Sequence, residues 1–146
     1  MSPDRLREFL SAGTRTAKLA TVRKDGRPHV LPVWFVLDRS TGGAGGAPDV
    51  IFMTGADTLK GKALRRDPRA CLCVDDEQPP FAFAMVEGTV ALSEDLDEML
   101  GWSVRIAERY MGAPLAEQYG RRNAVAGELL VRLTPDNVFA VEEVAD

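Results

Sequence analysis

The chain has 146 residues, of which 45% are hydrophobic and 27% are charged, and its formal net charge is −4. This length and composition are typical of one globular domain that buries a core without disulfides or a structural metal. The single histidine excludes a multi-histidine metal site, and the acidic balance disfavours a general nucleic-acid binder. No apolar stretch reaches the length of a membrane span, and the N-terminal residues carry acids where a signal peptide has an apolar core. We therefore expect one cytoplasmic domain over residues 1–146, with no membrane or nucleic-acid partner and no metal site.

A short helix is predicted at the N-terminus. Ser2 followed by Pro3 is typical of an N-cap and first helical position, and the helix is expected to end near Gly13. Apolar residues recur at helical spacing and give this helix one buried face. They are Leu6, Phe9 and Leu10.

A β-hairpin follows. The two β-rich runs Ala17–Arg23 and Pro28–Leu37 flank Asp25-Gly26, a pair that suits a turn with positive φ at both central residues. Pro32 cannot donate to a strand ladder, so the second strand is expected to bulge or lie at a sheet edge there. Trp34 and its neighbour Phe35 point to opposite faces of a strand, and we expect one in the core and the other over a pocket or an interface.

The rest of the chain alternates strands with helices. A Gly-rich loop over Arg39–Pro48 separates the hairpin from the next strand. Gly88 is expected to mark a bulge, Ser93 to cap the longest helix, and Pro135–Asn137 to divide the last two strands. The predicted strands are Asp49–Thr54, Arg69–Asp76, Phe81–Ser93, Glu128–Thr134 and Val138–Val144, and the predicted helices are Glu94–Gly112 and Leu115–Ala126. About seven strands with short connections and three or four helices predict a mainly β (α+β) fold, a small antiparallel barrel with helices around it.

The segment Thr58–Arg69 is the most basic part of the chain, with five basic residues and one acid. It follows a strand and a glycine turn, so a helix start with free N–H groups is expected there, beside Lys60 and Lys62, in an arrangement suited to a phosphate. Arg65 or Arg66 could clamp an anion with two parallel hydrogen bonds. The alternative is a solvated helix face with the apolar residues packed inward. Gly61 argues against that alternative, because glycine costs roughly 1 kcal/mol in a helix interior and is expected where backbone approaches a ligand closely.

Other chemistry-bearing residues give weaker signals. Cys71 and Cys73 share one strand face and are interpreted as small buried hydrophobes. His29 is interpreted as a structural hydrogen-bonding residue. No Ser-His-Asp, Cys-His or zinc-ligand spacing is present, so no catalytic side chain is identified. If the protein is an enzyme, its reactive chemistry is expected to come from a cofactor.

The order of motifs resembles a known family. The segments are KLATVRKDGRPHVLPVWFVLD, VIFMTGADTLKGKALRRDPRACLCVDD and FAFAMVEGTVAL. The most specific patterns in them are L-A-T-x-x-x-D-G-x-P-x-x-x-P-V-W and K-x-x-x-L-x-x-D-P-R. They are similar to those of the pyridoxamine 5′-phosphate oxidase-like flavin and deazaflavin oxidoreductases, over Thr16 to Val141. The short form of the chain resembles the actinobacterial branch that uses coenzyme F-420, a deazaflavin with a phosphate and a polyglutamate tail.

The resemblance implies a fold, an assembly and a site. The fold is a six- or seven-stranded split β-barrel that forms a homodimer with two cofactor sites at the interface. The cofactor phosphate would lie against Lys60, and nearby basic residues would bind the phosphate or the tail. The ring system would lie along two strand segments. The implied cofactor-binding residues are Leu31, Pro32, Val33, Trp34, Met53, Thr54, Lys60, Lys62, Arg65 and Arg66.

The resemblance also implies an activity. It is hydride transfer from reduced coenzyme F-420 to a small-molecule acceptor that is unsaturated, quinone-like or a tetrapyrrole, with no covalent protein intermediate. Two alternatives stay open: an FMN-dependent oxidoreductase of the same fold, and a non-catalytic protein that binds or carries a cofactor. Heme is the weaker choice of ligand, because the one histidine is expected at the mouth of the hairpin.

Overall fold

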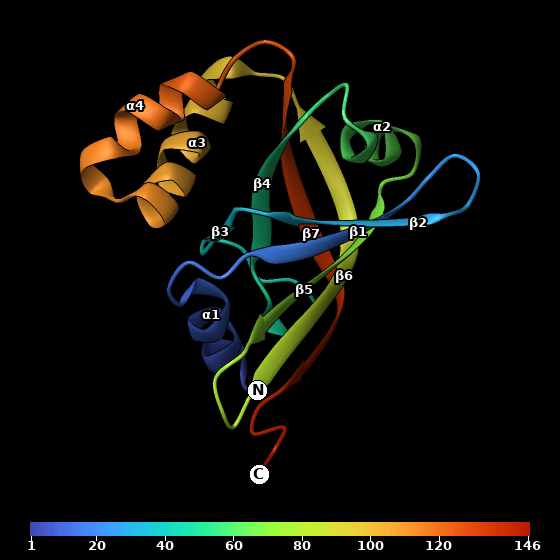
Figure 1. Ribbon diagram of the computed structural model, residues 1–146, viewed down its shortest axis with the longest axis vertical. Coiled ribbons are helices and arrows are strands. Elements are labelled where there is room, and N and C mark those ends of the chain that lie inside the picture. Colours follow the sequence, from blue (N-terminus) through green and yellow to red (C-terminus); the bar gives the residue numbers. More distant parts are fainter.

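The computed structural model describes residues 1–146 and shows seven strands in one sheet with four α-helices around it (Figure 1). The strands are β1 (Ala17–Val22), β2 (Pro28–Val33), β3 (Phe35–Asp38), β4 (Asp49–Gly55), β5 (Arg69–Asp76), β6 (Ala82–Ser93) and β7 (Glu128–Val141). The α-helices are α1 (Pro3–Ser11), α2 (Leu59–Arg66), α3 (Leu96–Met111) and α4 (Ala113–Asn123), and a short 3₁₀ helix, η1, spans Ala44–Gly46. None of these helices has both the length and the hydropathy that crossing a bilayer requires.

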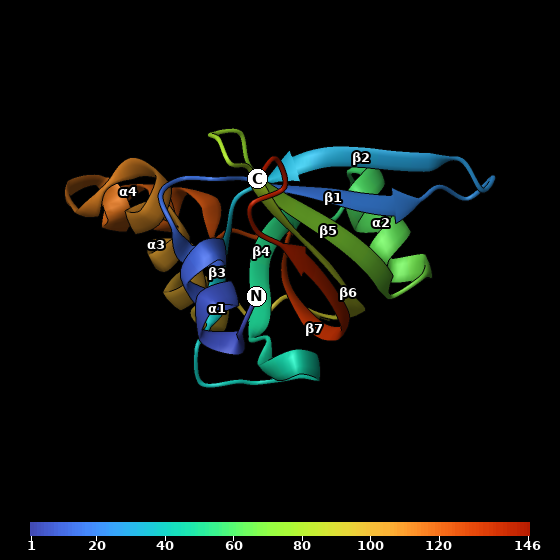
Figure 2. The ribbon, with the colours of Figure 1, turned by 90° about the horizontal axis from the view of Figure 1, so that it is seen from below.

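The sheet is curled into a split barrel. Its strand order is β2-β1-β5-β6-β7-β4-β3, and every neighbouring pair is antiparallel. The two edge strands, β2 and β3, are consecutive in the chain and separated only by Trp34. The sheet therefore has to curl until its two edges approach each other, and Figure 2 shows this curvature from below. The predicted mainly β, seven-stranded antiparallel split barrel is confirmed.

The hairpin prediction is confirmed, with two corrections. β1 and β2 pair from Ala17↔Val33 to Val22↔Pro28. The predicted turn with positive φ at both Asp25 and Gly26 is wrong, because only Gly26 has positive φ. The N–H of Gly26 donates to the carbonyl of Arg23, so Lys24 and Asp25 are the central residues of the turn. β2 is an edge strand, so Pro32 leaves no ladder bond unmade. The predicted strand Pro28–Leu37 is wrong as a single element, because the chain leaves one edge of the sheet at Trp34 and enters the other.

The core fills the inside of the curled sheet. Side chains alternate along β1 and β5 between this interior and the outer face, as the two-residue period of a strand requires. The predicted apolar face of α1 closes one end of the barrel with Leu6, Phe9 and Leu10, all buried. α3 covers the outer face of β4 and β7, where Met99 packs with Ile51 and Leu130. β4 is therefore buried on both faces.

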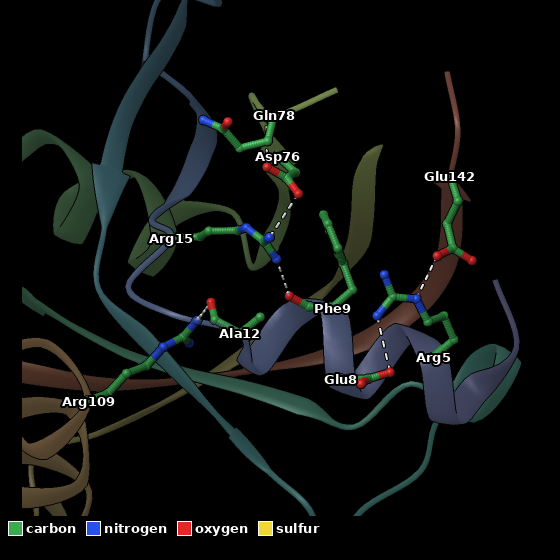
Figure 3. A network of polar contacts seen from close by, with 9 residues as sticks. All are labelled: Arg5, Glu8, Phe9, Ala12, Arg15, Asp76, Gln78, Arg109 and Glu142. Carbon is green, nitrogen blue, oxygen red and sulfur yellow. Dashed lines mark hydrogen bonds and ion pairs between the residues drawn. The ribbon is translucent and has the colours of Figure 1, made fainter. Parts of the chain in front are cut away.

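Three arginines hold α1 against the barrel (Figure 3). The Arg15 guanidinium donates to the carbonyl of Phe9 and to the carboxylate of Asp76 at the end of β5, both at 3.0 Å. Arg5 bridges Glu8 and Glu142, which follows β7. Arg109 of α3 donates to backbone carbonyls in the last turn of α1, just after it and on β3, which ties α3 to the same end of the barrel. The carbonyls are those of Leu10, Ala12, Gly13 and Phe35.

Two predicted details in the second half of the chain are wrong. Asp95 caps α3 in place of Ser93, and its carboxylate accepts from the N–H groups of Asp97 and Glu98. The last two strands form one strand, β7, because Pro135 lies opposite Gly88 at the predicted bulge, where the register shifts. A Cβ at Gly88 would overlap the Thr134 backbone, so this crossing point requires glycine.

Candidate functional site

A pocket of about 380 Å³ lies where the two edges of the sheet meet. Six parts of the chain line it: the β2–β3 junction, the end of β4, the start of α2, α3, the end of α4 and the start of β7. Six of the ten predicted cofactor-binding residues line this pocket: Pro32, Val33, Trp34, Met53, Thr54 and Lys60.

The structure places the other four predicted residues outside the pocket. Leu31 is exposed on the edge strand β2. Lys62 points to solvent from α2. Arg65 forms a 3.0 Å ion pair with Glu94, and Arg66 donates to the carbonyl of Val22 at 2.9 Å. The basic segment therefore divides into one cation in the pocket, Lys60, and outer cations that either point to solvent or contact other elements.

The start of α2 is built by Thr58. Its hydroxyl donates to the carbonyl of Gly55 at 2.7 Å and accepts from the N–H of Gly61 at 3.1 Å. This N-cap leaves the N–H groups of Leu59 and Lys60 without acceptors in the chain. Free N–H groups and the positive end of the helix dipole favour an anion beside Lys60.

Gly61 has a packing role, which corrects its interpretation as a point of close ligand approach. A Cβ there would lie 3.0 Å from the carbonyl oxygen of Ala56 and closer still to that of Gly55. The first turn of α2 packs directly on the turn that follows β4. This contact fixes the position of Lys60 relative to the end of β4.

Trp34 forms the aromatic wall of the pocket. Phe35 is fully buried, whereas Trp34 is 42% exposed, so the predicted division between core and pocket is confirmed. The Trp34 ring stacks on Tyr110 of α3, with centroids 4.8 Å apart and planes 3° from parallel. The Tyr110 hydroxyl accepts from the N–H of Phe35 at 3.2 Å and donates to the carbonyl of Arg15 at 2.8 Å. Burial raises the pKa of Tyr110, which keeps this hydroxyl protonated as a donor.

The charged end of the pocket holds Lys60 and Glu128. Glu128 begins β7 and pairs with Gly55 in the ladder between β4 and β7, so its side chain lies beside the start of α2. Burial raises the pKa of Glu128, and the positive charge of Lys60 partly offsets the rise. Neither side chain forms a hydrogen bond or an ion pair within the chain.

Six lining residues were not predicted from the sequence. Ser103 and Ile106 are three positions apart on α3, a spacing that puts them on one helix face, but the sequence does not show which element that face meets. The Ser103 hydroxyl donates to the carbonyl of Gly120 and ties α3 to α4. Gly55 and Thr58 are the strand end and the cap described above, and Asn123 and Glu128 stand at element ends. Ser103, Ile106, Asn123 and Glu128 reach this pocket only through the pairing of β4 with β7 and the packing of α3 and α4.

The remaining candidate residues lie away from the pocket. Cys71 and Cys73 are free thiols on the outer face of β5, half-buried where full burial was expected. Burial raises the pKa of both thiols. His29 stands on β2, opposite Thr21 of β1, and its Nδ1 atom is buried without a partner in the chain, so the expected structural hydrogen bond from this atom is absent.

Comparison with known proteins gives the family. A family model described as pyridoxamine 5′-phosphate oxidase matches residues 2–142. The chain belongs to the pyridoxamine 5′-phosphate oxidase family. This is a family of flavin-binding oxidoreductases, and membership accounts for the split barrel.

Solved structures share the fold of this family member at low sequence identity. A conserved hypothetical protein of Mycobacterium tuberculosis is 24% identical, with a TM-score of 0.76 over 98% of this chain and 86% of the other. A protein described as an F420 reductase is 22% identical, with a TM-score of 0.67 over 90% of this chain and 94% of the other. The heme storage protein of Vibrio cholerae is 18% identical, with a TM-score of 0.69 over 93% and 92%. Among curated proteins, no sequence matches the chain.

Proposed function

We propose that this protein is a reductase that binds coenzyme F-420 and transfers a hydride from the reduced cofactor to an unsaturated, quinone-like or tetrapyrrole acceptor. The observation that carries the proposal is the pocket at the sheet edges. Its aromatic wall is Trp34, stacked on Tyr110, and its charged end is Lys60, which lies at the start of α2 without a partner in the chain. Family membership supports a flavin-type cofactor. The structural neighbour described as an F420 reductase supports the deazaflavin.

The residues of the pocket fit a phosphate-bearing ring system. Lys60 and the free N–H groups of Leu59 and Lys60 would hold the phosphate. The apolar side chains of Val33, Trp34 and Ile106 would cover the ring and exclude water from it. Trp34 lies between the edge strands β2 and β3, and its backbone N–H has no acceptor in the chain. This N–H could donate to a polar atom at the edge of the cofactor ring.

The proposed division of labour leaves the electron transfer to the cofactor. Bound coenzyme F-420 supplies the hydride. The protein positions the ring against the Trp34 wall, and the stack on Tyr110 fixes the orientation of that wall. Exposed Lys62, and Arg66 beyond it, would face the anionic tail of the cofactor outside the pocket.

We also propose that the active form is a homodimer. No helix covers the outer face of β1, β2, β5, β6 and the second half of β7, and this face exposes apolar side chains that a monomer leaves in water. Val30, Phe139 and Val22 are 60%, 54% and 52% exposed, and Phe83 packs on Phe139 beside them. A second copy would cover this face. Sedimentation equilibrium measures the assembly, and a monomer at micromolar concentration would contradict this part of the proposal.

Binding of coenzyme F-420 and of FMN tests the cofactor, with quenching of tryptophan fluorescence as the signal because Trp34 lines the pocket. We expect tight binding of coenzyme F-420 and a loss of roughly 10- to 100-fold in Lys60→Ala, the range for one charged hydrogen bond. Lys62→Ala is the matched control, since Lys62 lies on the same helix outside the pocket, and its FMN affinity should be unchanged. Unchanged coenzyme F-420 affinity in Lys60→Ala would remove Lys60 from the site. Tighter binding of FMN would favour the FMN-dependent alternative.

Turnover is tested separately. Protein loaded with reduced coenzyme F-420 is mixed with a panel of quinones, tetrapyrroles and conjugated lactones, and cofactor oxidation is followed by absorbance. Oxidation faster than in free solution supports the reductase. Tight cofactor binding without oxidation by any acceptor of the panel would favour a non-catalytic cofactor-binding protein. One structural neighbour, the heme storage protein, is described as having a function of that kind.

A further inference from the structure

The pocket contains two side chains of opposite charge that form no hydrogen bond or ion pair within the chain. Lys60 enters it from α2 and Glu128 from the start of β7, and they form no ion pair with each other. Gly55 holds them in the same region, because it pairs with Glu128 in the ladder and its carbonyl accepts from the Thr58 cap that starts α2. A carboxylate beside the proposed phosphate site opposes the binding of any anion there.

The charge of Lys60 is the one that acts on Glu128. At this end of β4, Met53, Thr54 and Gly55 carry no charge. The charged residues on the neighbouring elements have partners of their own or point to solvent. Three arginines form ion pairs: Arg65 with Glu94, Arg121 with Glu117, and Arg132 with Asp38 and Asp49. Arg66 donates to the carbonyl of Val22. The side chains of Asp57, Lys62 and Arg122 are exposed to solvent.

We propose that the ionisation of Glu128 controls anion binding at Lys60, so that an anionic group enters this end of the pocket together with a proton on Glu128. The inference rests on the proposed phosphate site. With the pocket empty, Lys60 stabilises the ionised carboxylate of Glu128. A bound anion neutralises Lys60 and adds a like charge, so the carboxyl group then favours its protonated form.

The consequence is a coupling between pH and ligand charge. Because the coupling free energy is reciprocal, an anion that raises the pKa of Glu128 binds more tightly when Glu128 is already protonated. Affinity for a phosphate-bearing ligand should therefore fall as pH rises through the pKa of Glu128. Riboflavin, which lacks the phosphate of FMN, should bind with no such dependence.

Sulfate tests the proposal without any cofactor, because it stays a dianion across the pH range. The melting temperature of wild type, Glu128→Gln and Lys60→Ala is measured with sulfate at about pH 5 and about pH 8, with sodium chloride at matched ionic strength. We expect wild type to bind sulfate more weakly at the higher pH, by roughly tenfold for each unit by which sulfate raises the pKa of Glu128. Glu128→Gln should bind sulfate equally at both pH values, and Lys60→Ala should show only the general salt effect. Equal pH dependence in wild type and Glu128→Gln would overturn the proposal.

A second measurement uses wild-type protein alone and does not depend on the stability of a variant. The carboxyl carbon of Glu128 is titrated by NMR with and without sulfate, and we expect a higher pKa with sulfate. An unchanged pKa would overturn the proposal. If sulfate raises this pKa but neither coenzyme F-420 nor FMN binds, the proposed function fails and the control by Glu128 stands. If the cofactor binds and the pKa does not move, the reverse holds.

Discussion

Replacing Gly61 with alanine tests whether α2 is positioned by its contact with the turn after β4. The new Cβ would lie 3.0 Å from the carbonyl oxygen of Ala56, 3.1 Å from its Cα atom and closer still to the carbonyl oxygen of Gly55. These are backbone atoms, which cannot rotate away as the end of a side chain can. The first turn of α2 must therefore move outward, and Lys60 must move with it.

The sign of the stability change separates this contact from helix propensity. Propensity alone would make Gly61→Ala more stable by about 1 kcal/mol. Overpacking a tight contact costs about 1–3 kcal/mol, which cancels or exceeds this gain, so we expect a net loss of up to about 2 kcal/mol. Gly101→Ala is the matched control, because Gly101 lies in α3 and a Cβ added there would meet no atom within 4 Å, and it should gain about 1 kcal/mol.

Urea denaturation gives both free energies of unfolding, and a titration with coenzyme F-420 or FMN gives the effect on the site. We expect Gly61→Ala to lose both stability and affinity, and Gly101→Ala to gain stability with affinity unchanged. If Gly61→Ala were stabilised as much as Gly101→Ala, the α2 contact would not be tight, and the reasoning that places Lys60 through it would be refuted.

Two further variants test other parts of the structure. Tyr110→Phe keeps the stack on Trp34 but leaves the N–H of Phe35 and the carbonyl of Arg15 without this partner, so urea denaturation should show a loss of about 1–3 kcal/mol with the tryptophan emission maximum unchanged. Hydrogen bonds from Arg69 lower the pKa of Asp67 from 3.8 to about 2, so its contribution to stability is present above pH 3.8 and is lost as pH falls toward about 2. Asp67→Asn should therefore flatten the acid side of the stability curve between these values, and an unchanged curve would show that the pair does not form.

The parts of the fold that were predicted correctly depend on neighbours in the chain. Gly26 supplies the positive φ that the hairpin turn needs, and the Ser2 side chain caps α1 by accepting from the N–H of Arg5, three residues away. The cap of α3 was predicted two residues too early, because Ser93 and Asp95 are both acceptors and only the exit of the chain from β6 selects Asp95. Pro135 is typical of a strand break, and its accommodation within β7 depends on Gly88, which lies on another strand.

The candidate site was predicted in part for the same reason. Trp34, Met53 and Lys60 lie in the two segments that carry the recognisable motifs, whereas Ser103 and Glu128 reach the pocket through pairings with distant segments. The basic residues of Thr58–Arg69 could not be separated by type alone. Their separation follows from the direction of each side chain around α2, and from the partners that Arg65 and Arg66 find on other elements.

The segment from Met53 to Lys60 links both ends of the pocket to the closure of the barrel. Phe52, which precedes it, pairs with Phe35 beside the Trp34 wall, and Gly55 pairs with Glu128 at the charged end. The chain then turns directly into α2, whose N-cap and glycine contact are made with that same turn. The contacts that close the sheet are therefore the contacts that set the relative positions of the aromatic wall, Glu128 and Lys60. A substitution that loosens this turn should weaken folding and anion binding together, whereas Lys62→Ala, at an exposed position of α2, should change neither the stability nor the FMN affinity by more than a few tenths of a kcal/mol.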